Sequence, residues 1–275
     1  MTADAWLARH PYLQPIADLN AVVDSAACGI SPANPNGLSW DSYGDDFFRG
    51  VPLLHSSAIT IDWMPVEKII NEMIETLASS PLPGKLTEET RTLLTEGRAN
   101  PEAPRRVVAW LLGHDNSMSA CPGLLRYLGW TALSRYLCPL TDAFDRRREE
   151  DKWLRSYCPM CGSLPAMAQL VGADQARRRF LCCGCCGTRW QYLRTGCPFC
   201  ENADDHRLAF LAVEGEGGLR IDYCKSCEGY LKTYDGEGSE KVLLADWTSI
   251  HLDVVACDRG LKRLAASMYE LDMFS

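Results

Sequence analysis

The sequence lacks several features that would assign it to a common class of protein. No run of about 18 apolar residues occurs in its 275 residues, so we expect no membrane insertion. The first residues contain neither the basic segment nor the apolar run of a secretory signal, so the default location is the cytoplasm. A basic excess is also missing. The formal net charge is −8 and the pI is near 5.2, which disfavours a nucleic-acid partner.

Catalytic motifs are missing as well. There is no GxSxG elbow, no Walker phosphate loop and no Rossmann glycine fingerprint. None of the histidines shows the HxxxH or HExxH spacing of metal ligands. We therefore interpret each of the five as a surface or hydrogen-bonded side chain: His10, His55, His114, His206 and His251. The sequence predicts no enzyme and no catalytic residue.

Cysteine is abundant but very unevenly distributed. Of the 14 cysteines, three lie in residues 1–157 and ten lie in residues 158–227. In the reducing cytoplasm, closely paired cysteines indicate metal ligands or redox centres rather than structural disulfides. The four isolated cysteines are expected to pack as small apolar side chains: Cys28, Cys121, Cys138 and Cys257.

The cysteine-rich segment is an internal repeat. Two CxxC pairs recur after shifts of 39 and 41 residues, and each unit reads CxxC, hairpin, CxxC. Two such turns present four sulfurs to one ion and complete a tetrahedron, as in zinc ribbons and the iron site of rubredoxin. The sequence therefore predicts two metal ions. The expected ligands are Cys158, Cys161, Cys183 and Cys186 in the first site, and Cys197, Cys200, Cys224 and Cys227 in the second.

The second pair of the first unit can be read in two frames. Cys182 with Cys185 and Cys183 with Cys186 are both CxxC pairs. Gly187 follows the second frame directly, and a glycine there relieves backbone strain after the last ligand. We favour the 183/186 frame and leave the 182/185 frame open. In either frame a tetrahedral ion with four thiolates has no open position for water, which indicates a structural or recognition role.

The N-terminal part has the periodicity of helices. Apolar residues at helical spacing predict helices over 66–77 and 107–112, and a largely buried helix over 124–144. A shorter helix around Leu93 is expected to end at Gly97.

Beyond residue 158 the pattern changes to short β-like runs. Segments 164–171 and 178–182 predict one hairpin, and segments 207–213 and 219–223 predict another. A last helix is indicated by the apolar spacing from Leu261 to Leu271.

These elements predict an α+β fold with four parts. A helical domain occupies residues 1–151, and a first rubredoxin-like or zinc-ribbon module occupies 152–194. A second such module occupies 195–235, and a C-terminal segment with a helix occupies 236–275. The oligomeric state is not readable from the sequence.

The cysteine half resembles the FdhE family of formate dehydrogenase accessory proteins. The resemblance is carried by YCPMCGSLP at 157–165, FLCCGCCGTRW at 180–190, the pair Cys197/Cys200, DYCKSCEGYLK at 222–232 and LADWTSIHLD at 244–253, with a weaker match at 48–54. The doubled cysteines at 182–186 depart from the single CxxC expected in that family.

The resemblance implies a non-catalytic maturation factor for respiratory formate dehydrogenase, which binds the catalytic subunit in the cytoplasm before export. It also implies rubredoxin-like iron, with zinc as the alternative. A rubredoxin-like electron-transfer protein or a CxxC thiol oxidoreductase is the alternative function. We predict partner contacts near the cysteine turns, at Arg189, Trp190, Phe199, Lys225 and Tyr230.

Overall fold

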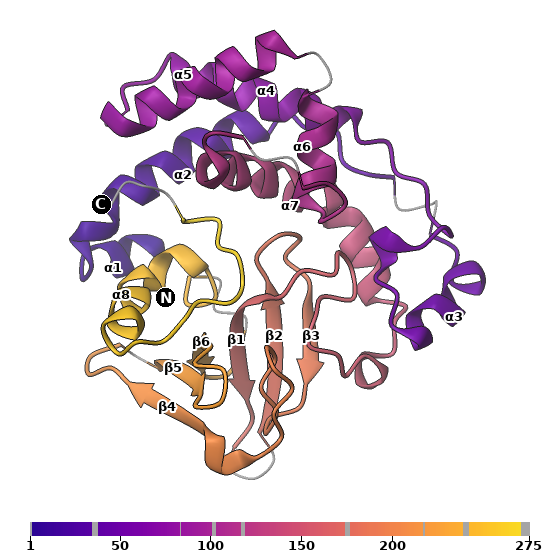
Figure 1. The fold of residues 1–275 in the computed structure, drawn as a ribbon, viewed down its shortest axis with the longest axis vertical. Helices are drawn as coiled ribbons and strands as arrows, with labels where there is room; N and C mark the ends of the chain where they lie inside the picture. The colour runs from indigo at the N-terminus through magenta and orange to yellow at the C-terminus, as the bar shows by residue number, and fades with distance from the viewer. Residues whose placement is uncertain are drawn as a thin grey trace.

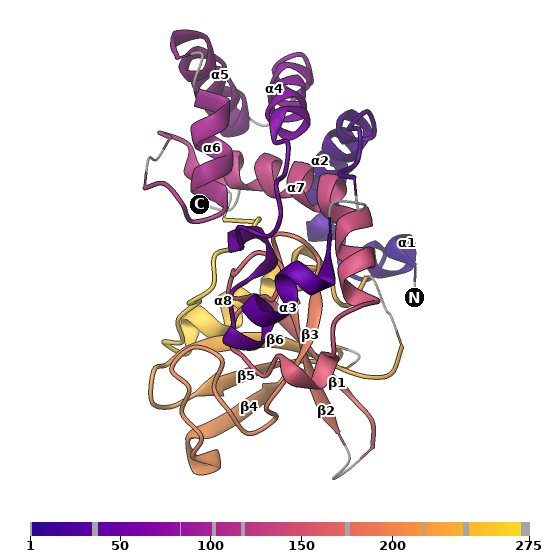
Figure 2. The same cartoon turned by 90° about the vertical axis from the view of Figure 1, so that its right-hand side faces the viewer.

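The computed structural model describes residues 2–34, 38–82, 84–100, 103–116, 119–173, 177–216, 218–238 and 242–270. Within these ranges the chain forms a helical layer stacked on a twisted β-sheet (Figures 1 and 2). The predicted α+β class is confirmed, since helices precede a sheet region with a C-terminal helix. No described helix is long and apolar enough to span a bilayer.

The helices agree with the predicted periodicity in most places. Their bounds are α1 (Ala3–Leu7), α2 (Gln14–Ala27), α3 (Trp40–Arg49), α4 (Met64–Ala78), α5 (Gly84–Ala99), α6 (Ala103–Leu111), α7 (Pro122–Asp145) and α8 (Ile250–Asp258). The expected end at Gly97 is wrong, because α5 runs on to Ala99. A single glycine costs only about 1 kcal/mol inside a helix. Gly113 does lie just beyond α6, with a positive φ of 78°.

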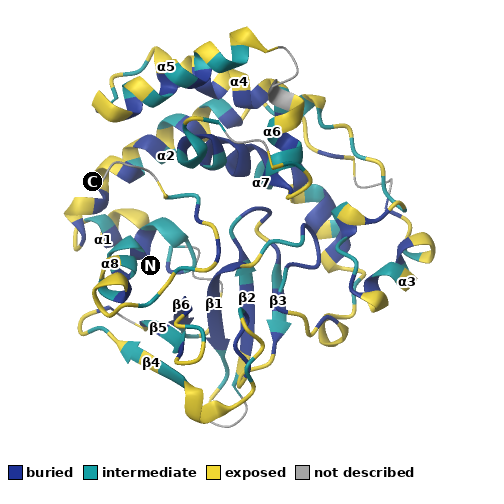
Figure 3. Ribbon diagram, viewed as in Figure 1, coloured by how far each residue is buried: buried dark blue, intermediate teal, exposed yellow. Residues whose placement is uncertain are grey.

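Helix α7 lies on the side of the helical layer that faces the sheet. It is buried on most faces, as its apolar composition predicts (Figure 3). Its underside packs on the first cysteine unit: a Cβ built on Gly184 would lie 3.3 Å from the ring of Trp130 and 2.9 Å from Ala166. One core therefore joins the helices to the first ribbon, and it includes Leu181 and Trp190.

The sheet has six strands in the order β3-β2-β1-β6-β5-β4. Their bounds are β1 (Pro165–Val171), β2 (Arg178–Cys183), β3 (Arg189–Tyr192), β4 (Leu208–Ala212), β5 (Leu219–Cys224) and β6 (Tyr230–Asp235). Both predicted hairpins are present as β1–β2 and β4–β5. Strands β3 and β6 complete each repeat and were not predicted. Each ribbon is thus a three-stranded antiparallel unit.

The two ribbons are joined head to tail. The first strand of one ribbon, β1, pairs in parallel with the last strand of the other, β6, with Met167 opposite Lys232. The free edge of β3 is covered where α7 ends, because the guanidinium of Arg148 donates to the carbonyl oxygen of Arg189. The two ribbon modules therefore share one continuous six-stranded sheet.

The N-terminal segment and α8 meet on the second ribbon. Trp6 and Leu13 share a core with Leu252 of α8 and Ile221 of β5. The indole nitrogen of Trp6 donates to the carbonyl oxygen of Thr248, 3.0 Å away. The predicted boundary at 151/152 stays a prediction, and both cores contain residues from either side of it.

The last helix lies earlier than predicted. It occupies Ile250–Asp258, whereas no helix is assigned to the described residues 261–270, and Leu271 lies outside the described residues. The backbone of Lys262 is used differently. Its carbonyl oxygen accepts from the amide of Tyr230 at 3.1 Å, and its amide donates to the carbonyl oxygen of Glu228 at 2.8 Å. Pairing with the second ribbon replaces helical hydrogen bonds here.

Candidate metal centres

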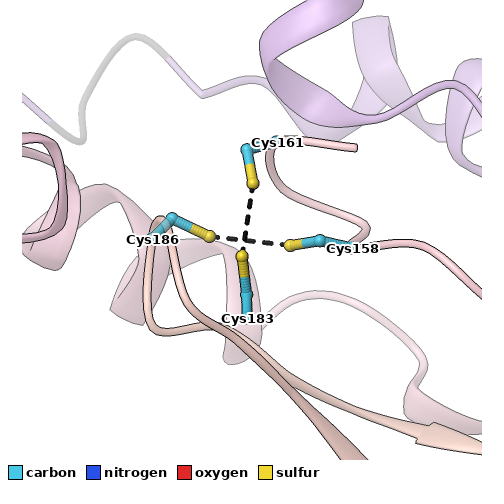
Figure 4. Close-up of side chains that lie close together, drawn as sticks. All are labelled: Cys158, Cys161, Cys183 and Cys186. Carbon is cyan, nitrogen blue, oxygen red and sulfur yellow. Dashed lines mark hydrogen bonds between the residues drawn. The ribbon is translucent and has the colours of Figure 1, made fainter. Parts of the chain in front are cut away.

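The first four-cysteine cluster lies beneath α7 and is wholly buried. Its sulfurs all lie within 4.8 Å of one another and converge on one point, as Figure 4 shows for Cys158, Cys161, Cys183 and Cys186. Two opposite edges measure 3.5 Å, from Cys158 to Cys186, and 3.4 Å, from Cys161 to Cys183. A tetrahedral ion with metal–sulfur bonds near 2.3 Å requires edges of about 3.8 Å, so the four thiols fit such an ion.

Two tight turns place these sulfurs. In the first turn the amide of Gly162 donates to the carbonyl oxygen of Cys158 at 2.9 Å. In the second the amide of Cys183 donates to the carbonyl oxygen of Thr188 at 2.9 Å. The residue after each second cysteine is left-handed, with φ of 78° at Gly162 and 77° at Gly187. The glycine that favoured the 183/186 frame thus occupies the conformation expected of it.

The alternative frame, Cys182 with Cys185, does not contribute to the cluster. Cys182 and Cys185 are free thiols outside the quartet. Burial raises the pKa of Cys182 to about 12. Cys185 is fully buried beside the cluster, and a hydrogen bond with Cys161 together with burial raises its pKa. Burial therefore favours the protonated form of both thiols.

The second cluster has the same plan but reaches the surface. Its sulfurs lie within 4.8 Å of one another, with edges of 3.7 Å from Cys197 to Cys227 and 3.8 Å from Cys200 to Cys224. These edges match a tetrahedral four-thiolate ion closely. Cys197 and Cys224 are buried, whereas Cys200 is exposed.

Left-handed residues close the turns of the second cluster too, but they are not glycines. Glu201 follows Cys200 with φ of 57°, and Glu228 follows Cys227 with φ of 60°. Such a backbone costs a residue with a Cβ about 1–2 kcal/mol. A left-handed residue therefore follows the second cysteine in all four CxxC turns, even in the two where that residue is a glutamate.

Burial and backbone amides act in opposite directions on these thiols. Burial raises the pKa of Cys158 and Cys186 in the first cluster and raises the pKa of Cys197 to about 12. Partial burial opposes ionisation of Cys224 as well, but hydrogen bonds from the amides of Cys227 and Ser226 lower its pKa to about 7. Metals bind the thiolate form of cysteine, so loading either cluster with a metal releases the protons that its thiols carry.

The residues predicted to contact a partner fall into two groups. Trp190 and Tyr230 are buried, and their polar atoms bond to the carbonyl oxygen of Arg155 and the carboxylate of Asp253. Their prediction as surface contacts is wrong, because both rings are core residues. The other three side chains reach the surface at least in part: Arg189, Phe199 and Lys225.

A buried charge network beside the second ribbon was not predicted. The ammonium of Lys232, with 1% of its side chain exposed, lies 2.6 Å from Asp246 and 2.7 Å from Asp253. The guanidinium of Arg263 lies 2.8 Å and 2.9 Å from the same carboxylates. The only sequence signal for this network is the alternation of side chains between the two faces of β6, which turns Lys232 inward. The network fastens the C-terminal segment to the sheet.

Comparisons with known proteins find similar sequences over part of this chain. Residues 157–194 match the family described as FdhE, central domain. The Protein FdhE homolog of Aquifex aeolicus is 35% identical over 133 residues, which are 46% of this chain and 47% of that protein. The homolog of Stutzerimonas stutzeri is 32% identical over 172 residues, 58% of this chain and 52% of that one. The matches thus span about half the length of these relatives.

The fold has a counterpart among solved structures. The crystal structure of the FdhE protein from Pseudomonas aeruginosa superposes with a TM-score of 0.60 at 22% identity, covering 94% of this chain and 88% of that one. At this identity the likeness establishes the fold alone. The predicted resemblance is confirmed: residues 157–194 match the FdhE central domain, and the chain is similar to curated FdhE homologs over about half of its length.

Proposed function

We propose that this chain is a non-catalytic accessory factor for the maturation of formate dehydrogenase, which binds the catalytic subunit in the cytoplasm before export. The observation that supports this most directly is the pair of four-thiol clusters within an FdhE-type fold. A four-thiolate ion offers no coordination position to a substrate, so the clusters suit a scaffold better than an active site.

In this proposal the eight cysteines hold two ions. The ligands are Cys158, Cys161, Cys183 and Cys186 in one cluster, and Cys197, Cys200, Cys224 and Cys227 in the other. A bound ion stabilises the thiolates and holds the two turns of each cluster together. The family resemblance favours iron, and the same ligands accept zinc. X-ray absorption at the metal edge of protein that holds only two metal equivalents should show both ions in sulfur-only shells. Sulfur numbers below four per ion would contradict the ligand set.

We place the docking face for the catalytic subunit beside the second cluster. Lys225 is exposed there, and Phe199 is partly exposed. Phe210 on β4 is 58% exposed, with the guanidinium of Arg220 4.6 Å above its ring. Exposed aromatic rings next to a cation are typical of interface contacts. Rigid turns also lower the entropy cost of binding.

Capture of the catalytic subunit tests both the function and the surface. The chain is immobilised with its metals, and binding of a purified formate dehydrogenase catalytic subunit is measured. A Lys225→Glu/Phe210→Ser variant should bind at least tenfold more weakly while keeping its metals and its melting temperature. The matched control is Lys68→Glu/Arg91→Glu, two exposed cations on α4 and α5. Undiminished binding by the first variant would refute the placement, and no binding by the wild type would refute the function.

A redox role is the second candidate, and one observation favours it. Cys200 is exposed, and hydrogen bonds from backbone amides lower the pKa of Cys224 in the same cluster to about 7, which favours its ionisation. Reversible one-electron reduction of the iron-loaded protein, with no binding of the catalytic subunit, would support this candidate over the first.

A further inference from the structure

Three side chains from distant parts of the chain meet at the edge of the second ribbon. His10 lies between α1 and the following turn, Glu216 lies in the β4–β5 connection, and His251 lies in the first turn of α8. The β4–β5 connection runs beside α8 in Figure 1. One ligand atom from each residue lies within 4.8 Å of the other two. The fold thus assembles two imidazoles and a carboxylate that share no sequence spacing.

The three groups are withdrawn from solvent. The side chains of His10 and Glu216 are each 10% exposed, and that of His251 is 19% exposed. Glu216 is turned inward although it belongs to a hairpin connection, between Gly215 with φ of 85° and Gly218 with φ of 97°. Burial of a carboxylate is costly unless a positive charge faces it.

The partners of these groups within the described chain do not satisfy them. The Nε2 of His251 lies 2.9 Å from Glu216 Oε2, yet the two are not aligned for a hydrogen bond. Among the described residues, neither ring nitrogen of His251 nor that oxygen has a hydrogen-bond partner.

His10 is oriented as a metal ligand would be. Its Nδ1 lies 3.1 Å from the carbonyl oxygen of Trp6, which can only accept, so Nδ1 carries the proton. Its Nε2 then faces Glu216 Oε1 at 3.5 Å. The indole of Trp6 stacks on the imidazole at 4.1 Å and holds its plane. Donation of the second ring nitrogen to a backbone carbonyl is the usual support of a ligating histidine.

From this geometry we propose that His10, Glu216 and His251 form a third metal site, which binds a divalent ion of the zinc class. Metal–nitrogen and metal–oxygen bonds near 2.0–2.1 Å require ligand separations of about 3.0–3.4 Å. The Nε2 of His251 lies 2.9 Å from one oxygen of Glu216, and the Nε2 of His10 lies 3.5 Å from the other. Two imidazoles with a carboxylate suit zinc and its neighbours rather than calcium or magnesium. The site differs from both cysteine clusters in its ligands and location.

Such an ion would tie three elements together. It would link the segment after α1 and the start of α8 to the β4–β5 connection, where the N-terminal segment and α8 already share a core. Only the folded chain brings these ligands together, so binding stabilises the folded state. Three protein ligands also leave a position for a water or a partner's side chain. The half-exposed ring of Tyr12 lies 5.9 Å from the ring of His251.

Zinc content and melting temperature test the proposal on the full chain. The wild type, saturated with zinc chloride and desalted, should retain one equivalent more than Glu216→Gln or His251→Gln. Two equivalents in each variant would show that the cysteine clusters, and with them the fold, are intact. Zinc absorption spectra should contain a nitrogen/oxygen shell in the wild type that is missing from the variants. Added zinc should also raise the melting temperature of the wild type more than that of either variant.

The control variant is His206→Gln. His206 is exposed beside Asp204 and Asp205, and these three residues are the other group of histidine and carboxylate side chains among the described residues. The His206→Gln variant should therefore keep the third zinc equivalent. The proposal is overturned if wild type and Glu216→Gln retain equal zinc, or if the additional equivalent is lost only in His206→Gln. These outcomes do not depend on binding of formate dehydrogenase.

Discussion

Replacing Lys232 with methionine tests how the second ribbon is fastened to the C-terminal segment. The ammonium contacts Asp246 at 2.6 Å and Asp253 at 2.7 Å, and it donates to the carbonyl oxygens of Asp246 at 3.0 Å and Ser249 at 3.3 Å. Methionine keeps the apolar stem but leaves two carboxylates without this partner. Removing one member of a buried ion pair costs about 3–5 kcal/mol. Because Arg263 still contacts both carboxylates, we expect a loss near the lower end, about 3 kcal/mol.

The pH dependence gives this prediction a second readout. Burial opposes ionisation of Asp246, but Lys232 and Arg263 outweigh it and lower the pKa below the usual 3.8. A lowered carboxyl pKa contributes stability above the unfolded value, and this contribution is lost as the pH falls toward the folded value. The variant raises the pKa of Asp246 and so loses part of that contribution. The stability difference between wild type and variant should therefore be fully present at pH 7 and should narrow below about pH 4.

Urea denaturation followed by circular dichroism, at matched metal content, measures both effects. The control is Lys262→Met, which removes an exposed ammonium 2.7 Å from Glu228 and should leave the midpoint unchanged. Breaking a buried ion pair usually costs about 3–5 kcal/mol. If Lys232→Met lowers the free energy of unfolding by less than about 1 kcal/mol at pH 7, the network does not hold the C-terminal segment on the sheet. An equal loss in both variants would have the same meaning.

Three further predictions concern the cysteine clusters. Cys183→Ser and Cys186→Ser should each lose one metal equivalent, whereas Cys182→Ser and Cys185→Ser should keep both; the reverse pattern of metal content would restore the other frame. Glu201→Gly removes a left-handed residue with a side chain, so the free energy of unfolding should rise by up to about 1 kcal/mol at unchanged metal content, and a decrease would contradict this account. Chelation should speed amide hydrogen exchange in β1 to β6 while α4 and α5 keep their protection, because those helices pack mainly on other helices. Simultaneous loss of protection in α4 would refute that separation.

The cysteine clusters were predictable because their chemistry is local. A CxxC pair is one tight turn, and the 41-residue shift from Cys183 to Cys224 also relates β2 to β5. Gly187 indicated the frame because a left-handed residue follows the second cysteine. Glu201 and Glu228 show the limit of that rule, since the same conformation occurs there without glycine.

The parts that escaped prediction depend on contacts between distant segments. The sequence near β1 does not indicate that it pairs with β6, which lies more than sixty residues away. Parallel strands are buried on both faces, so their sequences show no pattern that identifies the partner strand. The histidines were interpreted as isolated because their spacing is irregular, yet His10 and His251 meet through the fold. The final helix was misplaced for a similar reason, since pairing of Lys262 with the second ribbon overrides helical spacing.

The head-to-tail pairing of the two ribbons leaves a strand edge at each end of the sheet, β3 at one end and β4 at the other. A contact between the first strand of one unit and the last strand of another does not close on itself, so the same geometry could add further units or further molecules at β3 and β4. At the β3 edge the side chain of Arg148, three residues beyond α7 and 4% exposed, already occupies the carbonyl oxygen of Arg189. An incoming strand would need that carbonyl, so this contact makes the β3 edge less available for pairing.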